Sequence, residues 1–288
     1  MKTDMKEKII DSIKKHVLTC EENRFPEIGG NYFDEPVIRF ASWKDPLFGH
    51  YKTLIGDIYK TPEEAYEASY KDGSKDSARG GGSVISVLLP IAESIRKSNR
   101  PQKEWPSQSW ALARARFDDV YISIGSFIEN LLKQMGHRVI IPRFASWNEI
   151  IIVQNRFAAA WSERHAAYIA GHGTFSLNDG FITEKGIAVR FISAVTDIEL
   201  EPDVRLASDY NANCLYYAKG ICGACVKRCP AGAIAENGND KTKCYQRCYG
   251  EESQKLAVSY GGTTKAGAGC GLCQTGVPCE YENPVKQH

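Results

Sequence analysis

The sequence predicts an α+β protein in two parts, because stretches of helical periodicity mix with short β-branched runs before a segment dense in cysteine. The chain has 288 residues, enough for one large domain or for two domains of unequal size. Nine of its ten cysteines lie between Cys214 and Cys279. We therefore expect a larger domain over residues 1–206 and a smaller, cysteine-rich domain over residues 207–288.

The first elements are expected to be one helix, an irregular region and one buried strand. Apolar residues recur with helical spacing over Met5–Leu18, which predicts an amphipathic helix. Residues 20–80 are rich in glycine, proline and aspartate without a clear period, so we expect irregular structure with short helices near Thr61–Ser69. The run Val84–Leu89 is apolar and β-branched and ends at Pro90, which is typical of a buried strand.

A long helix and a second strand are expected next. Apolar positions over Val120–Met135 follow helical spacing, and Gly136 suits the C-terminal cap. The β-branched run 139–141, which ends at Pro142, predicts a strand. Ser146-Trp-Asn-Glu149 has the form of a capping box and therefore predicts the start of another helix.

Residues 162–195 are expected to form a helix followed by a pair of strands. The helix begins at Ser162 and ends near Gly171. Phe181–Ile182 and Ile187–Val195 are expected to pair with each other through a turn at Glu184–Gly186. Helices and strands thus mix over the first 200 residues without a regular βαβ period, which favours the α+β class.

Composition limits the classes of partner. Lys and Arg total 36 against 35 Asp and Glu, and there is no long basic run, so nothing in the composition favours nucleic acid or an anionic membrane. No apolar run approaches the length of a transmembrane helix. The charged start Met1–Lys8 lacks the apolar core of a signal peptide. We therefore expect a soluble, cytoplasmic protein in a compartment that keeps thiols reduced, with no membrane partner.

The spacing of the cysteines indicates iron–sulfur clusters. Cys222-Gly-Ala-Cys225-Val-Lys-Arg-Cys229-Pro230 resembles the signature of bacterial ferredoxins, in which thiolates hold [4Fe–4S] clusters and the cysteine before proline binds the other cluster. Zinc and disulfides are the rival interpretations. Zinc often recruits histidine, and none lies between His172 and His288, while disulfides suit small secreted domains. We favour iron–sulfur chemistry and expect Cys20, alone in a polar stretch, to be an ordinary thiol.

Two [4Fe–4S] clusters need eight thiolates, and the cysteine-rich segment supplies nine. The crossover of ligands in ferredoxins leaves Cys248 as the spare thiol. This choice stays open, since Cys244 and Cys248 lie one helical turn apart and either could reach a cluster. One cluster is expected to use Cys214, Cys222, Cys225 and Cys279, and the other Cys229, Cys244, Cys270 and Cys273.

A glycine-containing turn upstream of the cysteines carries a wider resemblance. By itself, Ala170-Gly171-His172-Gly173 fits an ordinary turn better than a binding loop. It is followed, however, by a strand that ends in Val195-Thr196-Asp197 and then by the cysteine motif. In this order the elements resemble the corrinoid iron–sulfur family of epoxyqueuosine reductases and reductive dehalogenases, over about residues 160–280.

The resemblance implies a nitroreductase-like domain that holds cobalamin without its lower base, followed by a ferredoxin-like domain. Electrons from an external low-potential donor, a ferredoxin or a flavodoxin, would pass through both clusters to cobalt in an oxygen-sensitive reductase of a small molecule. His172 is not implied as a lower ligand, because the chain has no Asp-x-His-x-x-Gly element, and we expect a capping or packing role for it. The corrinoid is expected at the glycine turn and the next strand, where close backbone approach is possible, against Gly171, His172, Gly173, Phe181, Ile182 and Thr183.

The resemblance also implies a proton donor at the start of the helix that faces the corrin. Residues 116–121 occupy about that place, and we expect Asp119 or Tyr121 to be the donor. The neighbouring Asp118 is equally suited to be a helix N-cap.

The chain departs from the family pattern at several points. Lys219 stands where the first cluster cysteine usually lies, so we expect a loop to bring Cys214 into its place. Ser176-Leu177 replaces the Gly-Arg of many dehalogenases, and we expect no C-terminal helical-repeat extension of the kind found in many epoxyqueuosine reductases. Two alternatives therefore stay open: an iron–sulfur electron-transfer protein without corrinoid, and a reductase of epoxyqueuosine in tRNA.

Overall fold

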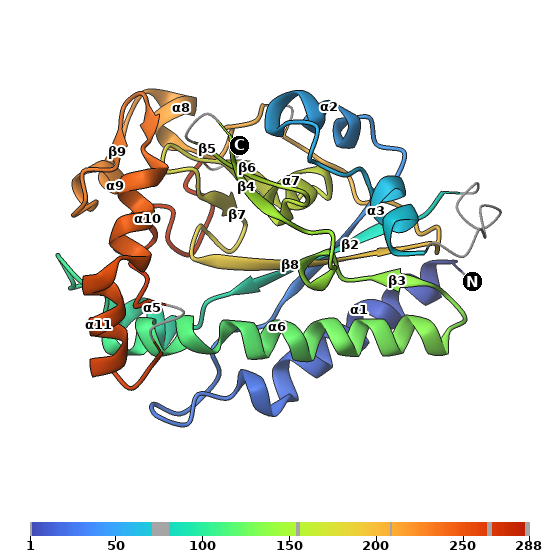
Figure 1. Cartoon of the computed structure of the whole chain (residues 1–288), viewed down its shortest axis with the longest axis horizontal. Coiled ribbons are helices and arrows are strands. Elements are labelled where there is room, and N and C mark those ends of the chain that lie inside the picture. Colours follow the sequence, from blue (N-terminus) through green and yellow to red (C-terminus); the bar gives the residue numbers. More distant parts are fainter. Residues whose placement is uncertain (1, 71–80, 154–155, 208, 264–266, 286–288) are drawn as a thin grey trace.

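The computed structural model describes residues 2–70, 81–153, 156–207, 209–263 and 267–285. Its centre is a four-stranded antiparallel sheet with strand order β1-β2-β8-β3 and helices on both faces (Figure 1). The central strands are long and apolar, and β2 is buried along its whole length. The strands are β1 (Val37–Ser42), β2 (Ser83–Pro90), β3 (Val139–Ile140) and β8 (Val189–Thr196). The α+β class predicted from the sequence is confirmed.

The two edges of β8 differ. On one side β2 pairs with it along the full length, from Val189 opposite Pro90 to Thr196 opposite Ser83. On the other side the short β3 pairs only with Val195 and Thr196. Among the strands that the structure describes, none covers the rest of this edge, so residues 189–194 of β8 face the surrounding side chains instead of another strand.

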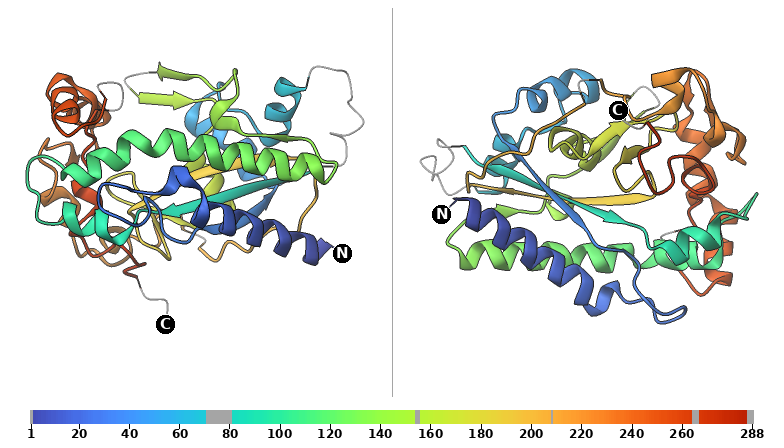
Figure 2. Two further views of the ribbon diagram at one scale, coloured as in Figure 1. Left: turned by 90° about the horizontal axis from the view of Figure 1, so that it is seen from below. Right: turned by 180° about the vertical axis from the view of Figure 1, so that it is seen from behind.

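One face of the sheet is covered by three helices that cross beneath it (Figure 2). These are α1 (Lys2–Thr19), α5 (Glu93–Asn99) and α6 (Gln108–Gln134). Ser107 caps α6 by accepting a hydrogen bond from the Trp110 amide at 3.2 Å, and Gly136, in the left-handed region with φ 82°, ends it. The core between α6 and the sheet includes Phe117, Val120, Ile124 and Ile192.

The opposite face carries a second core and two hairpins. Its helices are α2 (Leu47–Ile55), α3 (Pro62–Ser69) and α7 (Glu163–Ile169), and α7 contacts both β2 and β8. Aromatic side chains fill this core, among them Phe48, Tyr51, Tyr59 and Trp161. The two hairpins are β4 (Ile150–Val153) with β5 (Arg156–Ala159), and β6 (Gly173–Phe175) with β7 (Phe181–Thr183).

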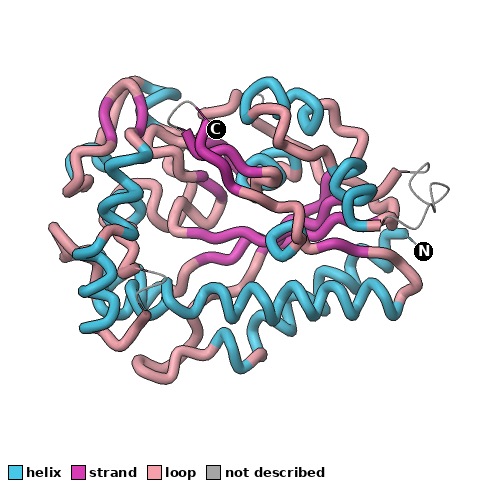
Figure 3. The backbone as a smooth tube through the Cα atoms, viewed as in Figure 1, coloured by secondary structure: helices cyan, strands magenta, loops and turns pink. Residues whose placement is uncertain are grey.

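The cysteine-rich segment lies at one end of the sheet (Figures 1 and 3). Trp110 in the first turn of α6 packs directly on Gly271, and Asn99 at the end of α5 donates to the Thr275 hydroxyl at 3.1 Å. The segment contains α8 (Leu215–Lys219), α9 (Ala224–Lys227), β9 (Ile234–Ala235), β10 (Gly238–Asn239), α10 (Lys241–Tyr249), α11 (Glu251–Ser259) and the 3-10 turn η3 (Leu272–Gln274). Two further 3-10 turns, η1 (Glu21–Asn23) and η2 (Pro142–Phe144), lie in the larger part of the chain.

Several predicted elements are wrong. The helix expected from Ser146 is absent, because the β-branched run Ile150–Val153 pairs with β5 instead. Phe181–Thr183 pairs with β6 and not with β8. The region expected to be irregular contains β1 and α2, and α6 begins at Gln108, so Asp118 lies inside the helix and is not its N-cap. In the part of the chain that the structure describes, no helix has the length and apolarity to span a membrane.

Candidate functional site

Four thiols line one small cavity. Cys214 precedes α8, Cys225 lies on α9, and Cys222 and Cys279 come from the adjoining loops. All four border a cavity of about 30 Å³ whose remaining wall is mainly apolar, with Leu177, Ile182, Ile187 and Val277. The thiols are free. Four thiols in an apolar setting match the donor set of a [4Fe–4S] cluster. We call these four residues the first thiol group.

Burial and the neighbouring thiols disfavour ionisation of two members of this group, Cys225 and Cys279. Burial raises the pKa of Cys225 to about 11, and the neighbouring Cys214 and Cys222 raise it further. Burial likewise raises the pKa of Cys279 to about 12, again with contributions from the other three thiols. Cys225 and Cys279 are therefore protonated in the metal-free chain at neutral pH, and iron binding would release their protons.

Five thiols make up a second group: Cys229, Cys244, Cys248, Cys270 and Cys273. Cys244 and Cys248 lie on α10, Cys273 lies on η3, and the Ala233 amide donates to the Cys229 sulfur at 3.3 Å. Burial raises the pKa of Cys270 and Cys273, and each is raised further by other thiols of the group. A hydrogen bond with the Cys248 thiol lowers the pKa of Cys244. Because Cys248 lies inside this group, the identity of the spare thiol stays a prediction.

In the described ranges, no three His, Cys, Asp or Glu side chains gather closely enough to hold a single metal ion. A cubane cluster separates its four thiolates more widely than one ion does, because its own iron and sulfide atoms lie between them. The arrangement of the nine thiols is thus compatible with clusters.

The segment that carries Cys279 is fixed by backbone bonds and a buried carboxylate. The Ile187 amide donates to the Cys279 carbonyl at 2.7 Å. Glu280, only 2% exposed, accepts from Arg100 Nε at 3.0 Å and lies 3.4 Å from Arg96. Its other partner is the Gly276 amide at 2.7 Å. These contacts hold the Cys279 backbone against the turn that joins β7 to β8.

The glycine turn predicted to hold a corrinoid is packed against protein. Gly171 has φ 80°, and a Cβ there would lie 2.8 Å from the Val204 carbonyl. A Cβ on Gly173 would overlap the Ile182 carbonyl across the β6–β7 hairpin. Both glycines are therefore required by the fold itself. His172 is buried, with Nε2 3.0 Å from the Ser86 carbonyl, and burial lowers its pKa to about 3, so it is a neutral packing residue.

The strand after the turn forms part of the core and of the thiol cavity. Phe181 makes edge-to-face contacts with Phe175 and Phe191, at centroid distances of 5.1 and 5.4 Å. The Thr183 hydroxyl donates to the Gly186 carbonyl at 2.9 Å. Ile182 borders the cavity of the first thiol group. This strand thus lies beside the thiols, and its role toward a corrinoid stays a prediction.

The two predicted proton donors lie on opposite faces of α6. Asp119 is 56% exposed, pairs with Arg116 at 3.5 Å and borders an open groove of about 800 Å³ between α1, η1 and α6. Tyr121 is buried toward the sheet, with Arg143 4.2 Å from its ring centroid. Burial raises the pKa of Tyr121. The structure therefore separates them, and only Tyr121 faces the inside of the protein.

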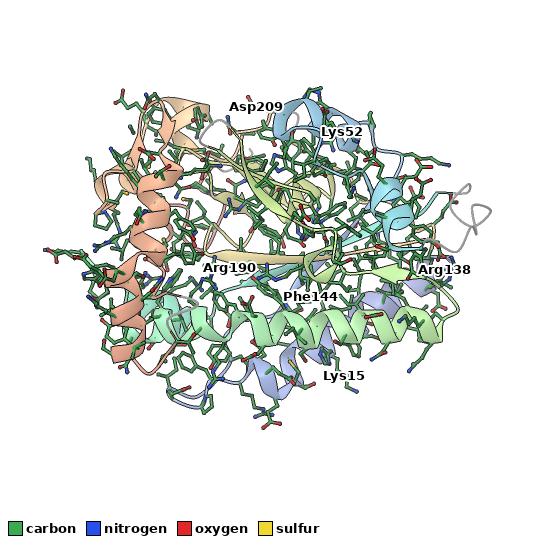
Figure 4. The ribbon with its side chains drawn as sticks, in the orientation of Figure 1. Lys15, Lys52, Arg138, Phe144, Arg190 and Asp209 are labelled. Atoms are coloured by element: carbon green, nitrogen blue, oxygen red, sulfur yellow. The ribbon has the colours of Figure 1, made fainter. Side chains whose placement is uncertain are left out.

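Sequence reasoning missed three residues around Tyr121, beside the uncovered edge of β8. Arg143 on η2 pairs with Asp118 at 2.6 Å, and Glu163 begins α7. Arg190 belongs to β8 and lies between that strand and α6 (Figure 4). We call Tyr121, Arg143, Glu163 and Arg190 the β8 edge site. An arginine inside an apolar strand was a usable signal for this site, whereas nothing in the sequence around Glu163 marked it.

Arg190 connects the β8 edge site to the second thiol group. Its guanidinium lies 5.2 Å from the centroid of Phe117 and donates to Gln274 Oε1 at 3.2 Å. Gln274 directly follows Cys273 in η3. The β8 edge site is thus one side chain away from the loop that carries a predicted cluster ligand.

Polar atoms without partners indicate that this region suits a ligand with hydrogen-bonding groups. Within the described residues, the hydroxyls of Tyr51, Tyr59 and Tyr210 and both carboxylate oxygens of Glu163 are buried and lack hydrogen bonds. Such groups are rare in native proteins and are usually satisfied by water or a bound molecule. Cobalamin, whose macrocycle carries many amide side chains, fits the requirement of the three tyrosine hydroxyls.

The fold is that of the epoxyqueuosine reductases, over the whole chain. Two solved structures, selenomethionine-labelled epoxyqueuosine reductase and epoxyqueuosine reductase with an epoxyqueuosine-modified tRNA-Tyr stem loop, each align with 100% of this chain and 68% of theirs. Both have a TM-score of 0.51 and 18% sequence identity. The resemblance predicted from the sequence is confirmed at the level of the fold.

Other comparisons are more distant. A reductive dehalogenase structure described as suggesting a mechanism for B12-dependent dehalogenation aligns with 70% of this chain and 26% of that chain, with a TM-score of 0.48 and 18% identity. The aligned part of the present chain thus corresponds to about a quarter of that dehalogenase. No protein-family model and no curated protein sequence matches the chain.

Proposed function

We propose that this protein is a reductase that uses two [4Fe–4S] clusters and a cobalamin to reduce a small molecule. The observation that carries the proposal is the gathering of nine thiols into two groups at one end of a fold shared with epoxyqueuosine reductase. The cysteine-rich part would act as a ferredoxin-like domain over residues 207–288, and residues 1–206 as a nitroreductase-like domain.

Each thiol group would hold one cluster. The first thiol group would provide Cys214, Cys222, Cys225 and Cys279. The second would provide Cys229, Cys270 and Cys273, with Cys244 as the fourth ligand and Cys248 as the spare thiol. Cys222 is exposed, so electrons would enter at the first thiol group from an external low-potential donor such as a ferredoxin or a flavodoxin.

The β8 edge site would lie beside the cofactor and the substrate. When bound, cobalamin supplies the metal centre through which electrons reach the substrate. Arg190 and its Gln274 partner would join the second thiol group to this region, and Arg143 would hold Tyr121 in place through ring contact. The buried aromatic side chains around α7 would exclude water from the reduction.

Anaerobic reconstitution with iron and sulfide, followed by metal analysis and cobalamin titration, tests the proposal. We expect about eight iron atoms per chain, because two cubanes bind four irons each. Cobalamin should bind with a base-off absorption spectrum. Cys20→Ser is the matched control, since Cys20 lies far along the chain from both thiol groups and should leave the iron content unchanged. Eight irons without cobalamin binding would instead support an electron-transfer protein.

A second candidate is reduction of epoxyqueuosine in tRNA. It is favoured by the alignment with the epoxyqueuosine reductase that holds a modified tRNA stem loop. The cofactors and their residues would be the same, and only the substrate would differ. Incubating the reconstituted protein with an epoxyqueuosine-containing stem loop, and analysing the nucleosides afterwards, separates the two candidates.

A further inference from the structure

Glu163 is a buried carboxyl group without a partner. Neither of its oxygens is exposed, and neither has a hydrogen bond to a residue that the structure describes. The contrast with Glu280 is clear, because that buried carboxylate is enclosed by two arginines and a backbone amide. An ionised carboxylate is stable in the interior only with such partners, so Glu163 must either be neutral or meet a partner from outside the chain.

Four polar side chains from different parts of the chain surround Glu163. The Ser193 hydroxyl on β8 and the Trp161 indole lie near it, but the indole donates to Ser193 at 3.0 Å. The Tyr59 hydroxyl, in the loop between α2 and α3, is also near and has no partner of its own. Tyr121 approaches from α6. All of these groups are uncharged at neutral pH.

Arg143 is the cation that faces Glu163, and its guanidinium already interacts with another carboxylate and with an aromatic ring. It pairs with Asp118 at 2.6 Å and lies over the Tyr121 ring at 4.2 Å. Burial raises the pKa of Glu163 to about 7, although Ser193, Arg143 and Trp161 lower it. A carboxyl group with a pKa near the working pH is suited to donating a proton and being recharged from water.

We propose that Glu163 is the acid that donates a proton to the molecule reduced at the β8 edge site. The inference rests on the proposed function and names a residue for it. The donor expected from the sequence, Asp119, lies on the opposite face of α6 and is exposed. Tyr121 lies in the same site as Glu163, but burial moves its pKa upward, away from the working pH.

The proton and electron balance is simple. Two electrons arrive from the external donor through the clusters, and one proton leaves the Glu163 carboxyl group. For an aryl bromide, the carbon–bromine bond breaks, bromide departs with an electron pair, and the proton completes a new carbon–hydrogen bond. For an epoxide, both carbon–oxygen bonds break and a carbon–carbon double bond forms, while the oxygen takes the Glu163 proton and a second proton from water and leaves as water. Glu163 is left as a carboxylate near Arg143 and takes a new proton from water.

Infrared spectroscopy of the iron-loaded protein tests the protonation state without any substrate. The parent should show a protonated carboxyl absorption that disappears with a midpoint near pH 7, and Glu163→Gln should lack it. Asp119→Asn, the matched control, should retain it. The inference would be overturned if the parent lacked the absorption even at pH 5.5, if the absorption did not change up to pH 8, or if Glu163→Gln still showed it. If Glu163→Gln does not fold, Glu163→Asp should keep the absorption with a shifted midpoint.

Cobalamin binding and turnover test the role. Glu163→Gln should bind cobalamin within about threefold of the parent affinity, whereas a loss above tenfold would show that Glu163 holds the cofactor and would overturn the acid role. With an aryl bromide or an epoxyqueuosine stem loop as probe, single-turnover reduction should fall by about 10²- to 10⁴-fold. If the parent reduces neither probe, the infrared result alone decides.

The two proposals fail in different ways. A protein that carries eight irons but no cobalamin removes the proposed function, while the infrared absorption still reports whether Glu163 is a neutral acid. A protein that binds cobalamin but lacks the absorption keeps the proposed function and removes only the role of Glu163.

Discussion

Two buried carboxyl groups show how one residue type takes opposite chemical states in this protein. Glu280 forms ion pairs with Arg100 and Arg96, whereas Glu163 faces uncharged groups and the already paired Arg143, and burial raises its pKa toward the neutral acid. Neither state was predictable from the sequence, because each depends on residues far away along the chain. Asp119 and Tyr121 lie on opposite faces of α6 through helical periodicity, and the packing of the helix on the sheet decides that Tyr121 is the buried one.

Replacing Glu280 should destabilise the protein. Glu280→Gln keeps the shape of the side chain but removes the counter-ion of Arg100 and leaves the largely buried Arg96 with Asp34 alone, at 4.0 Å, so the free energy of unfolding should fall by about 3 kcal/mol. Urea unfolding measures this change. Glu93→Gln removes the exposed partner of Lys97 on the same helix and should have no measurable effect. Equal stability of the two variants would contradict the prediction.

The raised pKa of Glu163 should make stability depend on pH. The pKa of Glu163 is about 7 in the folded chain, and in the unfolded chain it takes the ordinary value of 4.5. As the pH rises, the unfolded chain therefore loses this proton before the folded chain does. The Glu163 contribution to folding stability is therefore complete below pH 4.5 and is lost as the pH rises to 7, by on the order of 3 kcal/mol. Unfolding curves of the parent and of Glu163→Gln between pH 4.5 and 8 should show this slope in the parent alone. Parallel curves would contradict it.

At the scale of elements, local signals succeeded where they agreed with packing. The apolar run 84–89 and the periodic helix 120–135 are the cores of β2 and α6. The capping-box signal at Ser146 failed, because pairing of Ile150–Val153 with a neighbouring strand outweighs a cap. β1 was missed because the aromatic and charged residues around it obscure the alternation of its apolar side chains. The strand with which it pairs also cannot be predicted from local sequence.

The turn between β7 and β8 should control the position of Cys279. Gly186 has φ 79°, and a Cβ there would overlap the Glu280 backbone. Gly186→Ala should therefore displace the Cys279 segment and reduce the iron content from about eight to about four atoms per chain. Gly220→Ala is the matched control, because Gly220 has φ 65° beside the same thiols but open space around its Cβ position. Iron analysis showing equal losses in both variants would point to backbone strain instead.

The two thiols of α10 should differ in their effect on iron. Cys244→Ser should lose about half of the iron, since it removes a ligand of the second cluster, whereas Cys248→Ser should retain about all of it. The two residues lie one turn apart in the same thiol group, which makes each the control for the other. The reverse result would exchange their roles.

At the scale of the whole molecule, the sequence predicted the α+β class, the resemblance to the epoxyqueuosine reductase fold and the concentration of cysteine in the last part of the chain. It did not predict the uncovered edge of β8, because that edge exists only through the short length of β3 relative to its neighbour. The site beside this edge draws its side chains from α6, η2, α7 and β8, which are separated by up to about 70 residues. Long-range assembly of this kind has no local signature.

The packing of Trp110 on Gly271 sets an order for maturation. The loop between Cys270 and Cys273 takes its shape from a tryptophan in the first turn of α6, which is synthesised far earlier and belongs to the large core. Iron would therefore enter a scaffold that has already formed, unlike zinc fingers, whose folding depends on the metal. We expect iron-starved cells to accumulate a compact, protease-resistant apoprotein that is ready for later loading, rather than an unfolded chain marked for degradation.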